Sequence, residues 1–199
     1  MHAKVIVLAG PSGSGKSRLC KRLGLPTVNL DDFYKGGDDP TLPRVTLPGG
    51  EVIVDWDDPQ SWLCEEAADA LEQICTDGAA EVPVYEIAKD GRTGYRKLDI
   101  GDAPYFVAEG IFAQEVAALC RERDILADAI CVRNHPMVTF WRRLTRDLGE
   151  RRKPPHVLLR RGLLLMRQEP QIVAHAVALG CEAMTPDEAH RRIVALVGR

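Results

Sequence analysis

Short apolar runs alternate with stretches of helical periodicity along most of this chain. Apolar runs bounded by turn residues predict buried strands over residues 4–9, 26–30, 82–87, 105–108 and 128–133. Apolar residues spaced three and four apart predict helices over residues 16–23, 113–121, 136–149 and 156–179. An Asp or a Thr directly before a proline predicts two further helix starts, at Asp58-Pro59 and Thr185-Pro186.

This alternation predicts an α/β fold, in which a parallel sheet is flanked by helices on both faces. The 199 residues are enough for one domain of this kind, so we expect a single domain over 1–199. A stretch rich in Gly, Pro and Asp over residues 33–50 predicts a long functional loop. Ligands of such sheets bind at the carboxyl ends of the strands. Asp31, Glu109 and a glycine-rich loop all follow predicted strands, so we expect the site at the carboxyl ends of these strands.

Composition and charge narrow the class of protein. The chain is 45% hydrophobic and 28% charged, as is typical of a globular enzyme. A formal net charge of -3 predicts no general attraction to nucleic acid or to an anionic membrane, so any anion must be held locally. No apolar run approaches the roughly 20 residues of a membrane span, and the six cysteines form no C-x-x-C pair. We therefore expect a cytoplasmic protein whose cysteines are reduced and whose partner is a small molecule. We leave open whether it forms a homo-oligomer.

The run GPSGSGKS, from Gly10 to Ser17, fits the pattern G-x-x-x-x-G-K-[ST] between a predicted strand and a predicted helix. Glycines let the backbone curve so that successive N–H groups face phosphate oxygens, and the helix that follows adds its own unpaired N–H groups. Lys16 is expected to reach the β- and γ-phosphates, and Ser17 to ligate Mg²⁺. The pattern thus predicts a site for ATP and Mg²⁺ made of Gly10, Ser12, Gly13, Ser14, Gly15, Lys16 and Ser17. The alternative is a tight turn that carries a lysine by chance.

Other motifs indicate which phosphate chemistry to expect. The chain lacks the N-K-x-D and D-x-x-G motifs of GTPases. Instead, residues 29–35, NLDDFYK, resemble the D-S-F-Y segment of the uridine–cytidine kinases, within the uridine kinase and phosphoribulokinase group of P-loop kinases. Further motifs of that family resemble residues 54–59 (VDWDDP), 82–86 (VPVYE), 108–111 (AEGI) and 142–147 (RRLTRD). The resemblance implies a P-loop NTPase-like kinase core with a helical lid over about 142–156. It also implies acceptor-binding insertions over about 33–58 and 82–100.

The resemblance implies a role for each matching acidic residue. Asp31 matches the family's catalytic aspartate, and as a carboxylate beside the phosphate loop it could accept the acceptor's proton and touch the metal shell. Asp57 matches the aspartate that accepts hydrogen bonds from two ribose hydroxyls, and Asp55 is the alternative should the register shift by two. Glu109 is expected in the metal site, with a buried, salt-bridged glutamate as the alternative.

The remaining matches concern the base and the lid. Tyr85 and Phe33 are expected to wall a base slot, although aromatic residues at strand ends are often core. Asp90 stands where the family usually has a histidine that meets the pyrimidine, and is expected to contact substrate. Arg143 and Arg146 are expected to close over the transferred phosphate, and Arg151 to reach the substrate; a solvated basic face is the alternative.

Together these features predict an enzyme, a nucleoside kinase that transfers the γ-phosphate of ATP to the 5′-hydroxyl of uridine or cytidine in pyrimidine salvage. Two alternatives stay open. One is a kinase of another small hydroxyl acceptor, such as a phosphorylated pentose or a vitamin precursor. The other is a nucleotide-binding module that regulates a partner without catalysis.

Overall fold

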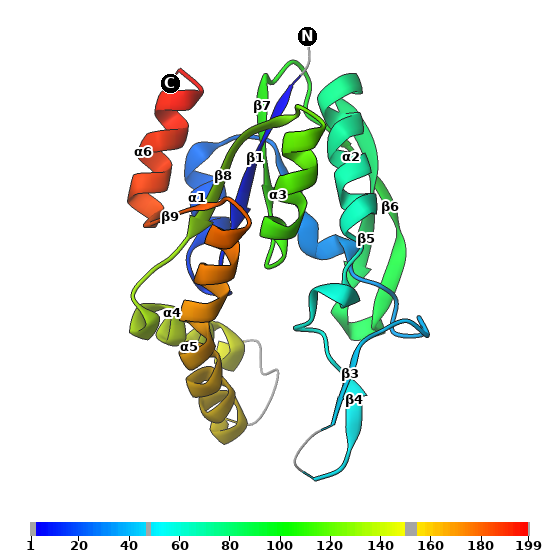
Figure 1. Ribbon diagram of the computed structural model, residues 1–199, viewed down its shortest axis with the longest axis vertical. Helices are drawn as coiled ribbons and strands as arrows, with labels where there is room; N and C mark the ends of the chain where they lie inside the picture. Colours follow the sequence, from blue (N-terminus) through cyan, green and yellow to red (C-terminus); the bar gives the residue numbers. More distant parts are fainter. Residues whose placement is uncertain (1–2, 47–48, 150–154, 199) are drawn as a thin grey trace.

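A five-stranded sheet, parallel throughout, forms the centre of the molecule (Figure 1). The computed structural model describes residues 3–46, 49–149 and 155–198. The strand order is β2-β7-β1-β8-β9. These strands span Thr27–Asn29 (β2), Tyr105–Glu109 (β7), Lys4–Ala9 (β1), Leu126–Val132 (β8) and Glu182–Met184 (β9). The predicted parallel sheet is confirmed.

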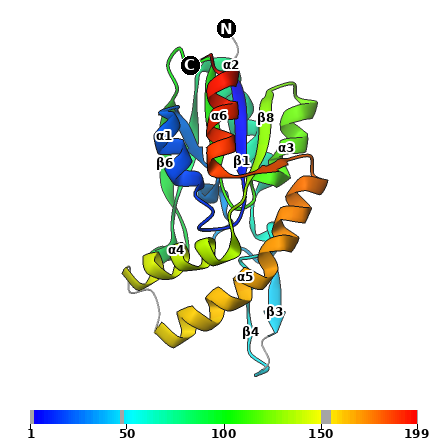
Figure 2. The ribbon, with the colours of Figure 1, turned by 90° about the vertical axis from the view of Figure 1, so that its left-hand side faces the viewer.

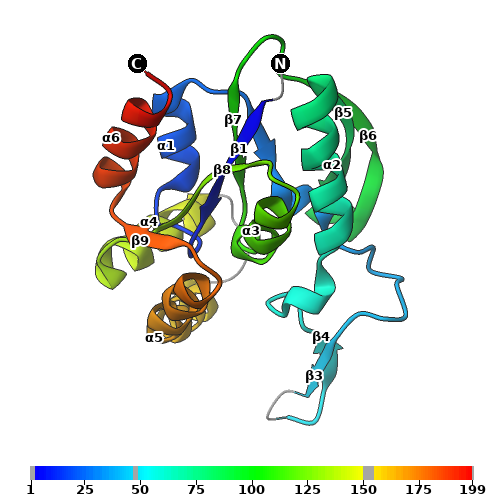
Figure 3. The ribbon, with the colours of Figure 1, turned by 45° about the horizontal axis from the view of Figure 1, so that its top comes forward.

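Helices cover both faces of this sheet because its central strand buries both of its faces. Successive side chains of a strand point to opposite sides, so Val5 and Val7 enter one core while Ile6 and Leu8 enter the other. Helices α2 (Cys64–Asp77) and α3 (Ala113–Glu122) cover the first face, and α1 (Lys16–Leu23) and α6 (Pro186–Leu196) cover the second (Figure 3). The predicted fold class is confirmed.

Two further helices, α4 (Pro136–Gly149) and α5 (Pro155–Ala178), lie across one end of the sheet (Figure 2). Their axes approach closely at Gly162, where an added Cβ would lie 2.7 Å from Cε2 of the Phe140 ring. None of the helices in the described part of the chain has the length and the apolar run that a membrane span requires.

Two antiparallel hairpins stand outside the sheet, in the segments predicted as insertions. One pairs β3 (Arg44–Thr46) with β4 (Val52–Val54) and projects from the molecule; the other pairs β5 (Ala79–Glu86) with β6 (Gly91–Asp99) beside α2 (Figure 1). Strand β6 was not predicted, because most of its side chains are exposed and it therefore has little apolar periodicity.

The helix predicted to start at Asp58 is divided. Oδ1 of Asp58 accepts a hydrogen bond of 2.8 Å from the Gln60 amide, as a cap should, but only a single 3-10 turn, Pro59–Ser61, follows. Trp62 is extended, and its indole Nε1 donates to the carbonyl of Leu30 at 2.7 Å. Helix α2 begins only at Cys64, after this buried tryptophan.

The predicted helix start at Thr185 is confirmed and generates a test. The Thr185 hydroxyl accepts from the Glu188 amide, and the Glu188 carboxylate accepts from the Thr185 amide at 2.8 Å. Thr185→Ala should lower the free energy of unfolding by about 1 kcal/mol, measured by urea denaturation. Thr76→Ala is the matched control, because that hydroxyl donates to a carbonyl one turn earlier within α2 and caps no helix end. An equal loss in both variants would contradict the cap.

Candidate active site

The glycine-rich loop lies between β1 and α1, as predicted, and its conformation requires glycine. Gly10, Gly13 and Gly15 have φ values of 129°, 87° and 109°, a region that other residues rarely adopt. A Cβ on Gly10 would lie 2.3 Å from the carbonyl oxygen of Val132, and one on Gly13 would lie 2.8 Å from that of Thr139. Glycine is therefore required in this loop for two reasons: the dihedral angles of its backbone, and the close approach of the neighbouring backbone.

Lys16 is the buried cation of this site. Its side chain follows the loop inward, and Nζ donates to the carbonyl of Gly10 at 2.6 Å. Burial lowers the pKa of Lys16, while the carboxylates of Glu109 and Asp31 oppose that shift. The cation and the two carboxylates thus form one electrostatic group.

Ser17 and Glu109 meet directly. The Ser17 hydroxyl donates to Oε1 of Glu109 at 2.8 Å. The contact follows from the sheet, because the parallel register pairs Leu8, at the end of β1, with Glu109 at the end of β7. A hydroxyl and a carboxylate are oxygen ligands of the kind that Mg²⁺ takes beside substrate phosphates. Within the described residues no group of three or more His, Cys, Asp or Glu that could hold a metal ion is found.

Asp31 faces the same space from the neighbouring strand end. The Asn29 side chain accepts from the Asp31 amide and starts a 3-10 turn, Leu30–Phe33, at the end of β2. Oδ1 of Asp31 accepts from the amide of Ile111 at 2.9 Å. This packing requires Gly110, since a Cβ there would lie 2.9 Å from Oδ1 of Asp31.

These groups line one cavity of about 430 Å³, which we call the phosphate cavity after its predicted ligand. Its walls come from the phosphate loop, the ends of β2 and β7, and α4: Ser12, Gly13, Gly15, Lys16, Ser17, Arg18, Asn29, Asp31, Glu109, Ile111 and Arg142. The structure thus brings Lys16, Ser17, Asp31 and Glu109 together, whereas Ser14 of the loop is fully buried and does not line the cavity.

An aromatic cluster stands beside this cavity, but Phe33 is not an exposed part of it. Phe33 is 1% exposed and packs in the core under the sheet, which corrects its expected place in a base slot. The next residue, Tyr34, has its ring 5.8 Å from that of Trp56 and 5.7 Å from that of Tyr85. Burial raises the pKa of Tyr34, and the charges of Asp31 and of the exposed Asp57 add to this shift. Tyr34 is thus affected by the charges of both aspartates, and its ring packs against that of Tyr85.

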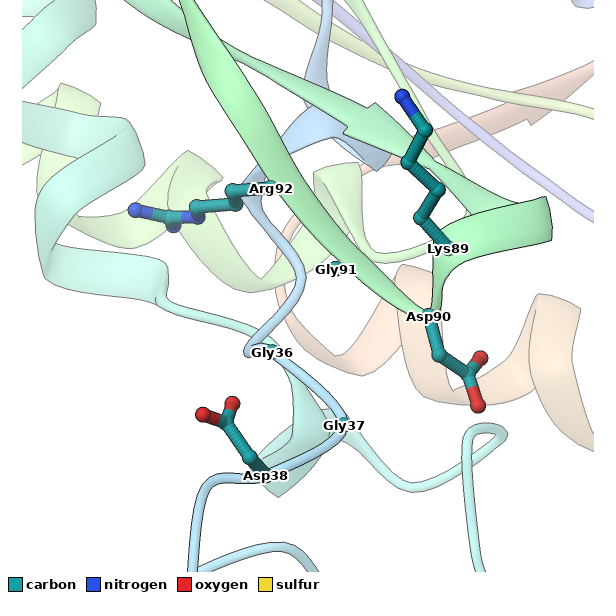
Figure 4. Close-up of a pocket in the computed structure, with 7 residues that line it drawn as sticks. All are labelled: Gly36, Gly37, Asp38, Lys89, Asp90, Gly91 and Arg92. Atoms are coloured by element: carbon teal, nitrogen blue, oxygen red, sulfur yellow. The ribbon is translucent and has the colours of Figure 1, made fainter.

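Asp90 lies in a different cavity, of about 480 Å³, between the loop after Tyr34 and the turn that joins β5 to β6 (Figure 4). Its carbonyl accepts from the amide of Gly37 at 2.7 Å and ties the two loops together. The neighbouring cations are engaged elsewhere: Lys89 with Glu86, and Arg92 with Glu66 and the Tyr34 carbonyl. This cavity shares no lining residue with the cavity that contains Lys16.

The arginines in the basic segment of α4 lie in different surroundings. Arg143 is buried, and its Nη2 donates to the carbonyl of Ser12 at 2.6 Å. Arg142, which belongs to the predicted lid but was given no role of its own, lines the phosphate cavity instead. The Arg146 side chain and all of Arg151 lie outside what the structure describes, so their predicted roles stay predictions.

Sequence reasoning also missed two asparagines. Asn29 lines the phosphate cavity and caps the turn that carries Asp31. Asn134 donates from Nδ2 to the carbonyl of Ser14 at 3.3 Å. Asn29 directly precedes the segment that carries Asp31, which is a local signal, but no sequence pattern connects Asn134 with a loop about 120 residues earlier.

Comparisons with known proteins found two relatives by sequence and several by structure. No family model matches the chain. Two curated proteins of Arabidopsis thaliana are similar to it: inorganic pyrophosphatase TTM2, 28% identical over 111 residues, and inorganic pyrophosphatase TTM1, 25% identical over 114. Each match takes in 55% of this chain, but only 15% and 16% of the length of these relatives.

Among solved structures, one assigned as a fructose transport system kinase from Silicibacter sp. TM1040 matches with a TM-score of 0.56 at 17% identity. The match covers 93% of this chain and 88% of that one. A possible uridine kinase from Bacillus stearothermophilus matches at 17% identity over 70% of this chain and 76% of its own, with a TM-score of 0.47. The chain therefore has an α/β fold, a parallel sheet flanked by helices, that it shares with a solved structure assigned as a kinase.

The close packing under Asp31 generates a test. Gly110→Ala should lower the free energy of unfolding by about 1–3 kcal/mol, because the new methyl group meets Leu30 and Asp31 at 2.9 Å. Differential scanning calorimetry of Gly94→Ala supplies the comparison, since a Cβ on Gly94 meets nothing within 4 Å. Equal stability of the two variants would show that Gly110 does not constrain Asp31.

Proposed function

We propose that the chain is an ATP- and Mg²⁺-dependent kinase that transfers the γ-phosphate to the 5′-hydroxyl of uridine or cytidine. The observation that supports the kinase part is a single cavity that joins the glycine loop and Lys16 to the Ser17–Glu109 pair and to Asp31. A phosphate cradle, a pair of oxygen ligands and a carboxylate base are the parts that phosphoryl transfer to a hydroxyl requires.

Each residue contributes a separate step. The amides of the loop and Lys16 bind the phosphates of the donor, and the buried position of Lys16 strengthens its attraction to them. Ser17 and Glu109 would hold the cation, which would offset the negative charge of the phosphates. Asp31 orients the acceptor hydroxyl and takes its proton as the hydroxyl oxygen bonds to the γ-phosphorus and the bond from that phosphorus to the leaving ADP breaks. Arg142 lies on the α4 side of the same cavity, where a cation can stabilise charge that develops during transfer.

The nucleoside part of the proposal rests on the acceptor side. Tyr34, Trp56 and Tyr85 offer aromatic faces beside Asp31, and a nucleobase stacks well on such faces. Asp57 lies on the same side and influences the Tyr34 hydroxyl, and its carboxylate can accept from two sugar hydroxyls at once. These residues belong to the motifs that resemble those of the uridine–cytidine kinases.

One observation favours a second candidate, a kinase of a small acceptor that is not a nucleoside. Asp90 replaces the expected histidine and lines a cavity that shares no lining residue with the phosphate cavity. An acceptor without a base would need neither that position nor a histidine.

A coupled assay of ADP release separates these candidates. The panel contains uridine, cytidine, fructose, a pentose phosphate, pyrophosphate and a reaction without acceptor. Stimulation by uridine and cytidine supports the nucleoside kinase, and stimulation only by a sugar supports the second candidate. A separate phosphate assay without ATP that finds pyrophosphate hydrolysed would point to the activity named in the curated relatives. Tight ATP binding with no turnover on any acceptor would contradict the kinase proposal.

The proposed base generates a sharper prediction. Asp31→Asn should lower kcat by about 10²–10³-fold, in the lower part of the range for general bases, because the transition state of phosphoryl transfer is loose. ATP affinity should change little, and the hydrogen bond from Ile111 can persist. Asp32→Asn is the matched control, since Asp32 faces Arg96 of β6 at 3.6 Å. Similar kcat values for both variants would remove Asp31 from the chemistry.

A further inference from the structure

Arg92 joins three parts of the molecule beside the proposed acceptor side. It lies near the start of β6, and its side chain is directed away from Lys89 and Asp90 (Figure 4). Its Nε donates to the backbone carbonyl of Tyr34 at 3.2 Å, and its Nη1 donates to Oε1 of Glu66 at 2.7 Å. The side chain is mostly buried, with 20% of it exposed. One guanidinium therefore links β6 to α2 and to the segment that contains Tyr34.

The peptide that joins Tyr34 to Lys35 is held from both sides. Its carbonyl accepts from Arg92, and its N–H, which belongs to Lys35, donates to the carbonyl of Ser61 at 2.9 Å. In a planar trans peptide these two groups point in opposite directions, so the peptide lies between β6 and the 3-10 turn Pro59–Ser61. It cannot rotate without the loss of a hydrogen bond. The backbone of Tyr34 is fixed in this way.

A second contact from the same hairpin holds this loop a little further along the chain. The carbonyl of Asp90, in the turn between β5 and β6, accepts from the amide of Gly37 at 2.7 Å. A Cβ on Gly37 would lie 2.9 Å from that carbonyl oxygen, so the two backbones approach as closely as glycine allows. Figure 4 shows the loop beside the hairpin turn. The hairpin therefore holds residues 34–37 at two points.

The position of Tyr34 matters because its side chain contacts the other aromatic residues of the acceptor side. Its hydroxyl donates to the carbonyl of Trp56 at 3.2 Å, and its ring lies 5.8 Å from that of Trp56 and 5.7 Å from that of Tyr85. Asp57, the proposed partner of the sugar hydroxyls, directly follows Trp56. A displacement of the Tyr34 backbone would therefore disturb both the aromatic faces and the segment that carries Asp57.

We propose that Arg92 is a positioning residue for the acceptor: it holds the Tyr34 carbonyl and so keeps the Tyr34 ring and the Trp56–Asp57 segment in place. Glu66 in turn orients the guanidinium, whose planar fork of donors has a fixed geometry. Arg92 does not line the phosphate cavity, so its effect should be confined to the acceptor. The inference rests on the acceptor side of the proposed function, but not on whether the acceptor is a nucleoside or another small hydroxyl compound.

The test compares the KM values of the two substrates in Arg92→Met, which keeps an apolar stem but no donor. The acceptor is the compound of the panel that stimulates the wild type most, which is uridine under the proposed function. We expect its KM to rise about tenfold, the value of one hydrogen bond to a charged group, while the KM for ATP stays unchanged. Arg92→Lys keeps the charge, but its single nitrogen cannot replace both Nε and Nη1, so most of the rise should persist.

Arg123→Met is the matched control. The side chain of Arg123 is exposed to a similar extent, 22%, and it also bonds to α2, with Nη1 2.7 Å from Oδ1 of Asp69. It follows the last residue of α3, however, and has no recorded contact with the loop that contains Tyr34. Its loss should lower the free energy of unfolding, measured by urea denaturation, and leave both KM values unchanged.

A double-mutant cycle tests the part played by Glu66. If Glu66 acts through Arg92, the variant that combines Glu66→Gln with Arg92→Met should have the acceptor KM of Arg92→Met alone; additive rises would overturn this part.

The acceptor KM of the Arg92 variants decides the proposal. An unchanged acceptor KM in Arg92→Met, an equal rise in both KM values, or full recovery in Arg92→Lys would overturn it. If Arg92→Met does not fold, Arg92→Lys decides alone, and an acceptor KM equal to that of the wild type refutes the proposal. A wild-type chain that no acceptor stimulates would refute the kinase itself, and the inference with it. A stimulated wild type with unchanged KM values in the variants refutes the inference alone.

Discussion

The parallel pairing of β1 with β7 is the constraint on which the site depends. It aligns Leu8 with Glu109, while β2 aligns Asn29 with the same residue from the other side. Three strands therefore end at one edge, and whatever follows each of them must share that space. The glycine loop follows β1, the turn with Asp31 follows β2, and Glu109 closes β7. The hydrogen bond between Ser17 and Glu109 is a direct consequence of this register.

Because these elements meet at one edge of the sheet, glycine is needed where one backbone packs closely against another element. Gly10 lies against the backbone of β8, Gly13 against that of α4, and Gly110 against Asp31, each at a distance that excludes a Cβ. These three contacts join elements far apart in the sequence, and each positions a group of the cavity. Interiors packed at this density transmit displacement rather than absorb it. Movement of α4 is therefore coupled to the loop through Gly13 as well as through Arg143.

Features that short segments encode could be predicted from the sequence, and features decided by distant packing could not. The strands around the glycine loop, the loop itself and the Thr185 cap each depend on residues within one turn or one strand. Phe33 and Tyr34 are adjacent aromatic residues, and only the direction of the turn after β2 decides which of them is buried. Arg142 and Arg143 are likewise adjacent, yet one lines the cavity and the other holds the loop from behind, because neighbours on a helix point about 100° apart.

The charges around the loop also explain why a divalent cation belongs to the proposed reaction. Asp31 and Glu109 lie close enough to Lys16 to oppose the effect of burial on its pKa. Without a counter-charge, both carboxylates would repel the phosphates that the loop amides attract. Asp31 and Glu109 thus place two negative charges beside Lys16, the buried cation of the site. A cation held by Ser17 and Glu109 would reduce that repulsion in the proposed reaction. In the proposed reaction, a dependence on Mg²⁺ would therefore follow from the placement of a carboxylate base next to a phosphate cradle.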